Sequence, residues 1–148
     1  MKPRTYRTKP LADLAALNAS QEKVPGFSLA AYQASAALFI GGGGIGSQAI
    51  QGCVRKGLWE FHICDEDFVE AKNLTRQLFS REDIGKNKAV RLARRAAREG
   101  LFPGTVTGYP WHFQELVQRD RVPQNLKCIV CGVDNNPTRV DATEYGIA

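Results

Sequence analysis

Residues 36 to 46 have the sequence Ala36-Ala37-Leu38-Phe39-Ile40-Gly41-Gly42-Gly43-Gly44-Ile45-Gly46, which predicts a buried strand, a glycine turn and the start of a helix. Glycines let a backbone approach a polyphosphate closely, and the free N–H groups of the following helix face the anion. A turn of this kind fits mononucleotide and dinucleotide sites equally well, and plain strand-to-helix packing is the alternative.

Length and composition indicate one ordinary globular domain. The chain has 148 residues, of which 43% are hydrophobic and 24% charged, values that exclude wholesale disorder. No apolar run approaches membrane-spanning length and the N-terminus lacks an apolar signal segment, so we expect a cytoplasmic protein with no membrane partner. The four cysteines fall in predicted helix or buried strand, where free thiols fit a reducing compartment.

The net charge of +5 is local. Residues 86 to 99 carry six basic residues against one acidic residue, and residues 1 to 10 add four more. A solvated face of an amphipathic helix is the expected reading of the first segment. The alternative is a surface for an acidic protein or, less expected, for nucleic acid.

Strands and helices are predicted to alternate. We expect a basic arm, disordered or loosely packed, over residues 1 to 10, and short helices within the remainder of residues 1–35. Residues 36–148 then form a nucleotide-binding domain with strands at 36–40, 58–64, 104–109 and 127–133 and helices at 45–57, from 86, at 113–118 and at 136–146. This alternation predicts a three-layer α/β, Rossmann-like, doubly wound and mainly parallel sheet.

Polar residues follow the predicted strands, where sites in such sheets lie. Asp65 can accept hydrogen bonds from ribose hydroxyls, in NAD and ATP alike. Asn73 and Arg76 suit phosphate contacts, although helix capping and a surface ion pair are alternatives. A lysine near the start of the basic helix, Lys86 or Lys88, can balance phosphate charge, and Asp134 can either bind magnesium or cap the next helix.

Five linked motifs resemble the adenylation motifs of the ThiF/MoeB/HesA superfamily, which includes the ubiquitin-activating enzymes. They are Gly41-x-Gly43-Gly44-Ile45-Gly46, Asp65-x-Asp67, Asn73-Leu74-x-Arg76-Gln77, Gly85-x-x-Lys88 and Val133-Asp134-Asn135. The likeness covers residues 36 to 140, which is the N-terminal part of such a domain. The resemblance therefore implies an incomplete sheet, because family members continue with more strands, a catalytic cysteine and often a zinc site.

The resemblance implies ATP-dependent adenylation of the C-terminal carboxylate of a ubiquitin-like or sulfur-carrier protein ending in Gly-Gly. The adenylyltransferase would be a homodimer or heterodimer. The implied nucleotide-binding residues are Gly41, Gly43, Gly44, Gly46, Asp65 on the ribose, and Asn73, Arg76 and Lys88 on the phosphates. Asp134 would bind Mg2+, and Arg76, Lys88 and Asp134 would be catalytic.

Two other functions are compatible with parts of this pattern. An NAD-dependent oxidoreductase would use the same glycine turn and Asp65, but it gives no role to Asn73, Arg76, Lys88 or Asp134. A non-catalytic scaffold half of a two-part activating enzyme would keep the fold and bind a partner.

Overall fold

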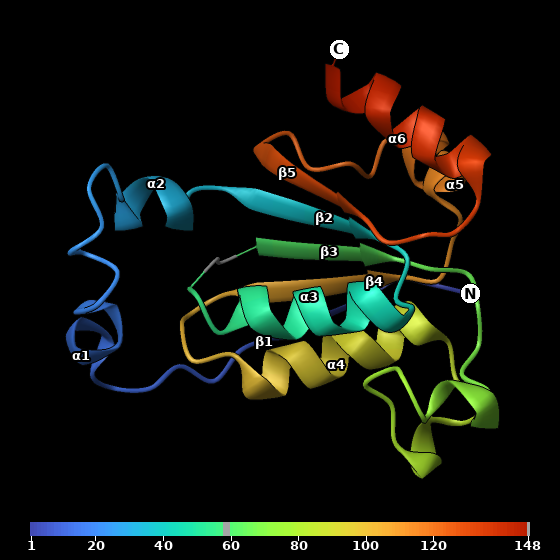
Figure 1. Cartoon of the computed structure of the whole chain (residues 1–148), viewed down its shortest axis with the longest axis horizontal. Coiled ribbons are helices and arrows are strands. Elements are labelled where there is room, and N and C mark those ends of the chain that lie inside the picture. Colours follow the sequence, from blue (N-terminus) through green and yellow to red (C-terminus); the bar gives the residue numbers. More distant parts are fainter. Residues whose placement is uncertain (58–59, 148) are drawn as a thin grey trace.

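A computed structural model describes residues 1–57 and 60–147 and shows one sheet with helices on both faces (Figure 1). The elements in chain order are β1 (Arg4–Arg7), α1 (Leu14–Asn18), α2 (Leu29–Gln33), β2 (Ala36–Ile40), α3 (Gly44–Val54), β3 (Glu60–Cys64), the 3-10 turns η1 (Ala71–Asn73) and η2 (Arg81–Asp83), α4 (Lys88–Glu99), β4 (Thr105–Tyr109), α5 (Phe113–Gln118), β5 (Leu126–Cys131) and α6 (Asn136–Ile147). None of the described helices is long and apolar enough to cross a membrane. The predicted α/β class is confirmed.

The strand order is β1-β4-β3-β2-β5, with β2, β3, β4 and β5 parallel and β1 antiparallel to β4. The chain runs outward from β2 through β3 to β4 and then returns to the other side of β2 to form β5. Ile40 is in register with Cys64 on one side and with Cys131 on the other. The loops after β2, β3 and β5 therefore leave the sheet side by side, at the point where the strand order reverses.

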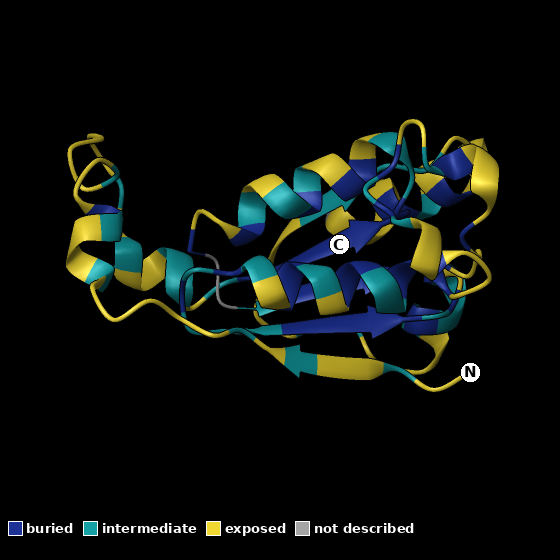
Figure 2. Ribbon diagram, turned by 90° about the horizontal axis from the view of Figure 1, so that it is seen from below, coloured by how far each residue is buried: buried dark blue, intermediate teal, exposed yellow. Residues whose placement is uncertain are grey.

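Each face of the sheet has its own core. Every residue of β2 is buried, because helices cover both of its faces (Figure 2). On one face, Phe39 and Phe61 stack with ring centroids 6.0 Å apart beneath α3 and α4. On the other face, Leu38 and Ile40 pack with Trp111, Leu116 and neighbouring residues of α5 and α6. These two cores complete the predicted three layers.

The N-terminal residues are more ordered than the sequence predicted. Instead of a loose arm, residues 4–7 form β1 on the edge of the sheet. Tyr6 packs against the core beneath α4, and the Thr8 hydroxyl donates to the carbonyl oxygen of Phe102 at 2.6 Å. These contacts half-bury the Tyr6 side chain and give the segment backbone partners, neither of which the run of basic residues indicates.

Two further predictions need adjustment, and a third lies partly outside the described residues. Cys128 and Cys131 are exposed, not buried, because β5 is the other edge strand of the sheet. The basic helix starts at Lys88, because the side chain of Asn87 caps it. Leu58 and Trp59, which the predicted second strand included, lie outside the described residues, and β3 is described from Glu60.

Candidate functional site

The glycine loop after β2 packs so closely that side chains are excluded at two positions. Gly41 has a positive φ of 91°, and its N–H donates to the carbonyl oxygen of Cys64 at 2.9 Å. A Cβ atom on Gly46 would lie 2.0 Å from the carbonyl oxygen of Gly41. The first turn of α3 therefore rests directly on the loop, as the predicted phosphate-binding turn requires.

The start of α3 has no acidic or capping side chain of its own. Its N-cap is Gly43, whose residue type supplies no capping oxygen, and its first turn contains no Asp or Glu. The first-turn N–H groups of a helix lack intrahelical partners and carry the positive end of the helix dipole. This helix start can therefore bind an anion, as at many phosphate sites.

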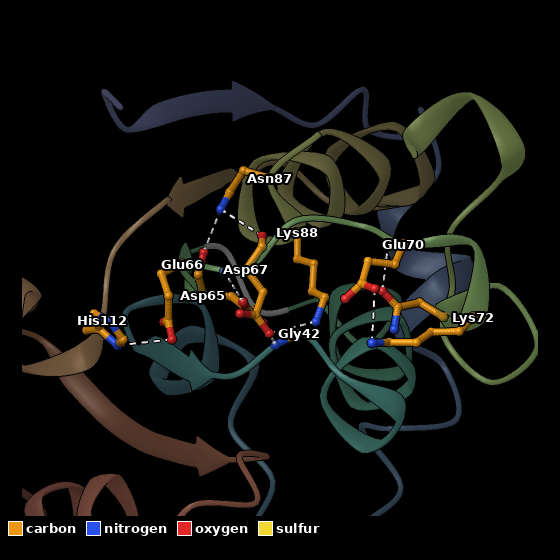
Figure 3. Close-up of polar contacts among 10 residues, drawn as sticks. Gly42, Asp65, Glu66, Asp67, Glu70, Lys72, Asn87, Lys88 and His112 are labelled. Carbon is orange, nitrogen blue, oxygen red and sulfur yellow. Dashed lines mark hydrogen bonds and ion pairs between the residues drawn. The ribbon is translucent and has the colours of Figure 1, made fainter. Parts of the chain in front are cut away.

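Asp65 connects the glycine loop to the end of β3 (Figure 3). Its Oδ2 accepts from the N–H of Gly42 at 2.6 Å, and its Oδ1 accepts from the N–H of Asp67 at 2.9 Å. Burial raises the pKa of Asp65 to about 6, although these two hydrogen bonds and the charge of Lys88 act in the opposite direction. Each carboxylate oxygen keeps a second lone pair, so Asp65 can still accept a hydrogen bond from a ribose hydroxyl.

Asn87 and Lys88 attach the start of α4 to the same strand end. The Asn87 side chain accepts from the N–H of Val90 and donates through Nδ2 to the carbonyl oxygens of Asp65 and Asp67, at 2.8 and 3.1 Å. The Lys88 ammonium lies 2.9 Å from Oδ2 of Asp67, and the Lys88 side chain is largely buried. Lys88, not the exposed Lys86, is thus the lysine placed at the strand ends.

The segment between β3 and α4 supplies Asn73, Arg76 and Gln77. Asn73 is buried and its Oδ1 accepts from the N–H of Glu70, so the capping role that the sequence left open is present. Its NH2 group is then the part of the side chain suited to a phosphate oxygen. Arg76 is exposed, whereas Gln77 is buried and its Oε1 has no hydrogen-bond partner among the described residues. Both residues line the cavity described below.

The turn after β5 brings in Asp134. Asp134 is exposed, and the next residue, Asn135, caps α6 by accepting from the N–H of Thr138 at 2.9 Å. Asn135 therefore plays the capping role that was the alternative for Asp134, and the Asp134 carboxylate remains available to another partner. Arg139 donates to the carbonyl oxygen of Val133 and holds this turn against the first turn of α6.

A cavity of about 630 Å³ gathers these segments at the carboxyl edge of the parallel strands. Its volume lies in the range of sites for drug-sized ligands. The predicted site residues that line it are Gly41, Gly43, Gly44, Asp65, Asn73, Arg76, Lys88 and Asp134. Gly46 lies behind the loop, where it allows the close packing with Gly41. We call this space the glycine-loop cavity.

The charges around the glycine-loop cavity are mixed. Five carboxylates line it against four Lys or Arg side chains. A triphosphate would add more negative charge to the carboxylates, so a divalent cation is the species that balances the two. No three His, Cys, Asp or Glu side chains of the described chain converge into a ready-made metal site.

Sequence reasoning missed Asn87 and the pair formed by Glu66 and His112. Asn87 stands directly before the observed helix α4, but the prediction placed it inside a helix that starts at residue 86, so its capping role and its bonds to two carbonyl groups of the preceding strand end were both missed. His112 Nδ1 lies 3.0 Å from Oε1 of Glu66 across the cavity rim (Figure 3). Nothing in the spacing of these two residues, which belong to different loops, predicts that contact.

Comparisons with known proteins agree with this geometry. The model of the ThiF family matches residues 18–148. Among curated relatives, the NEDD8-activating enzyme E1 catalytic subunit of Caenorhabditis elegans is 29% identical over 126 residues, which are 81% of this chain and 29% of the relative. The Nedd8-activating enzyme E1 catalytic subunit of Drosophila melanogaster is 35% identical over 100 residues, or 66% of this chain and 21% of the relative.

A solved structure shares the fold. The E. coli protein MccB, in a crystal structure with ATP, superposes with a TM-score of 0.63 at 24% identity, covering 78% of this chain and 34% of that protein. The chain thus spans between about a fifth and a third of the length of these three proteins.

Proposed function

The chain belongs to the ThiF family, and from this membership and the glycine-loop cavity we propose that it binds Mg-ATP as part of an activating enzyme. That enzyme adenylates the C-terminal carboxylate of a ubiquitin-like or sulfur-carrier protein ending in Gly-Gly. The observation that carries the proposal is the convergence of five separate segments on one cavity, where a glycine loop, a strand-end carboxylate, a buried lysine and an exposed arginine and aspartate meet.

The fit of the cavity to ATP rests on three features of this chain. The free start of α3 offers N–H donors to phosphate oxygens, and the loop before it packs closely on α4, because a Cβ on Gly42 would lie 2.5 Å from Cδ1 of Leu92. Asp65 offers carboxylate oxygens to the ribose. Asp134 is the residue that would hold Mg2+, which supplies charge neutralisation for the phosphates when bound.

In the proposed reaction, a carboxylate oxygen of the carrier protein attacks the α-phosphorus of ATP. The new bond joins this oxygen to the α-phosphorus. At the same time the bond between the α-phosphorus and the oxygen that bridges to the β-phosphate breaks, and pyrophosphate leaves with the bonding electrons. No general base is needed, because a carboxylate is already ionised near neutral pH. Arg76 and Lys88 lower the barrier by aligning the phosphates and by neutralising charge that develops on them.

Lys88 would exchange partners during this cycle. Its ammonium pairs with Asp67, whose side chain is 62% exposed and can turn away into solvent. The Lys88 ammonium is largely buried and needs a partner, so a phosphate oxygen would take the place of the Asp67 carboxylate. The ion pair with Asp67 therefore holds the Lys88 side chain in a defined position beside the glycine loop.

The test is ATP–pyrophosphate exchange with labelled pyrophosphate and carrier proteins ending in Gly-Gly. It should be run on this chain and on any longer protein that contains it. Lys88→Ala and Asp134→Asn should each lower exchange by about a hundredfold or more, while Lys86→Ala, an exposed lysine two residues away, should not. Equal activity of the Lys86 and Lys88 variants would refute the assigned roles.

Nucleotide binding distinguishes the activating enzyme from an NAD-dependent oxidoreductase and from a non-catalytic scaffold half. A thermal-shift comparison should show stabilisation by Mg-ATP and none by NADH, whereas the reverse would identify an NAD-dependent oxidoreductase. Tight ATP binding without exchange in the longer protein would favour the scaffold half. Light scattering at several protein concentrations tests the proposed homodimer or heterodimer.

A further inference from the structure

A second concave surface lies on the outer flank of α4, away from the glycine-loop cavity. This groove of about 440 Å³ runs between β1, η2 and α4, and seven Lys or Arg residues line it against Glu82 and Asp83. We call it the basic groove. One side of the groove is β1, a strand that the sequence does not predict. Its position beside α4 brings the basic residues of segment 1–10 next to those of segment 86–99.

Only part of this positive charge is neutralised within the fold. Arg91 forms an ion pair with Asp83, and Nη1 of Arg95 donates to the carbonyl oxygen of Leu78 at 2.8 Å. Arg94 and Arg98 are exposed, and no hydrogen bond or ion pair reaches either guanidinium from the described part of the chain. They stand four residues apart on one helix, a like-charge spacing that disfavours the helix. An external anion would remove that repulsion.

The free edge of β1 borders the same groove. The N–H of Thr8 donates to the carbonyl oxygen of Gly104 at 3.0 Å, which continues the antiparallel register of Thr5 with Thr107 and Arg7 with Thr105. In such a ladder, hydrogen-bonded and non-bonded pairs alternate. The N–H and C=O groups of Thr5 and Arg7 therefore point away from β4 toward the edge, where the described residues offer no partner strand.

We propose that the basic groove binds an extended polypeptide segment that adds a strand to the free edge of β1. Acidic residues at alternate positions of this segment pair with Arg94 and Arg98. Strand residues two apart are separated by about 6.6 Å on one face, and helix residues four apart by about 6 Å, so the two spacings match. Guanidinium groups bind carboxylates in a two-pronged geometry.

A peptide fits this surface better than a nucleic acid does. Strand addition uses main-chain N–H and C=O groups, which a nucleic acid cannot supply in that pattern. Tyr6 is the sole aromatic residue lining the groove among those described, and it is half-buried against the core, so no exposed ring is offered for base stacking. This inference does not depend on the adenylation proposed above.

The first experiment measures binding of a fluorescent peptide of about ten residues with glutamate and valine in alternation. Arg94→Glu with Arg98→Glu should weaken binding at least about tenfold. The matched control is Arg55→Glu with Lys56→Glu, which makes the same charge change at two exposed residues after α3 and should have a much smaller effect. Equal losses in the two double variants would overturn the proposal, and circular dichroism checks that each variant is folded.

The second experiment tests strand addition without altering the protein. Peptides N-methylated on alternate amides, in one register or the other, should differ at least about tenfold in affinity, because only one set of N–H groups faces β1. Equal affinities would refute strand pairing. An isomeric peptide with its glutamates in one block, or a single-stranded oligonucleotide of equal charge, should bind more weakly. Stronger binding by either would identify a general anion surface or a nucleic-acid surface instead.

Discussion

Replacing Gly46 by alanine tests how the glycine loop is built. The added methyl group would lie 2.0 Å from the carbonyl oxygen and 3.0 Å from the carbonyl carbon of Gly41. Both atoms belong to the backbone, and Gly41 is itself tied to β3 through its hydrogen bond to Cys64. Neither partner can rotate away, so the loop or the start of α3 must move.

Overpacking of this kind costs about 1–3 kcal/mol of unfolding free energy. For a domain of this size each kcal/mol lowers Tm by roughly 2–4 °C, so Gly46→Ala should melt several degrees below the wild type. Gly43→Ala is the matched control, because a Cβ there meets nothing within 4 Å and φ is −73°. The control should keep the wild-type Tm within about 1–2 °C.

The assay is thermal unfolding followed by circular dichroism, with urea unfolding as a check and ATP affinity measured by calorimetry. A displaced loop moves N–H groups away from the phosphates, so Gly46→Ala should also weaken ATP binding, when measured well below its lowered Tm. A Gly46→Ala protein with wild-type Tm and wild-type affinity would show that the loop is not packed against α3 as described.

Three other predictions concern buried polar groups. Because the pKa of Asp65 is raised to about 6 in the folded chain, folding favours its protonated form, and its ionisation should lower stability by about 3 kcal/mol as pH rises from about 4 to about 6. Urea unfolding at several pH values should show this slope in the wild type and not in Asp65→Asn. Asn87→Ala removes a helix cap and two bonds to carbonyl groups, so it should lower the unfolding free energy by about 2–3 kcal/mol, and an unchanged denaturation midpoint would contradict that account. Asp83→Ala strands the guanidinium of Arg91 and should cost about 2 kcal/mol or more in the same assay, with Arg91→Ala milder because Asp83 keeps its bonds to Ser80.

The sequence was sufficient for the parallel part of the sheet. The strand β2 is an apolar run followed by glycines, and α4 has a one-sided apolar stripe. The pattern is weaker in β4, which contains two threonines and a glycine. Local pattern therefore determines β2 to β5, and the order of motifs predicts that Asp65 and Asp134 lie at the same edge.

What could not be predicted depends on contacts distant in sequence. Four residues, Arg4 to Arg7, become a strand only because the edge of β4 and the underside of α4 are available to them. The exposure of Cys128 and Cys131 follows from the position of β5 in the strand order, which residue type does not reveal. The pairing of Lys88 with Asp67 likewise required the fold.

The two cores of the sheet become available at different times as the chain is made. The buried residues beneath α3 and α4 all lie between Ala37 and Val106, whereas those on the other face need Tyr109 to Ala142. During synthesis on a ribosome, the core beneath α3 and α4 can therefore pack before the residues of the other core have been made. The strand β2 can pair with β5 only after that later segment has been synthesised. Long-range parallel pairing is slow, so we expect a late docking step for β5, α5 and α6. Truncating Leu116 to alanine should then speed unfolding and leave the folding rate almost unchanged, whereas a slowed folding rate would place the second face in the nucleus.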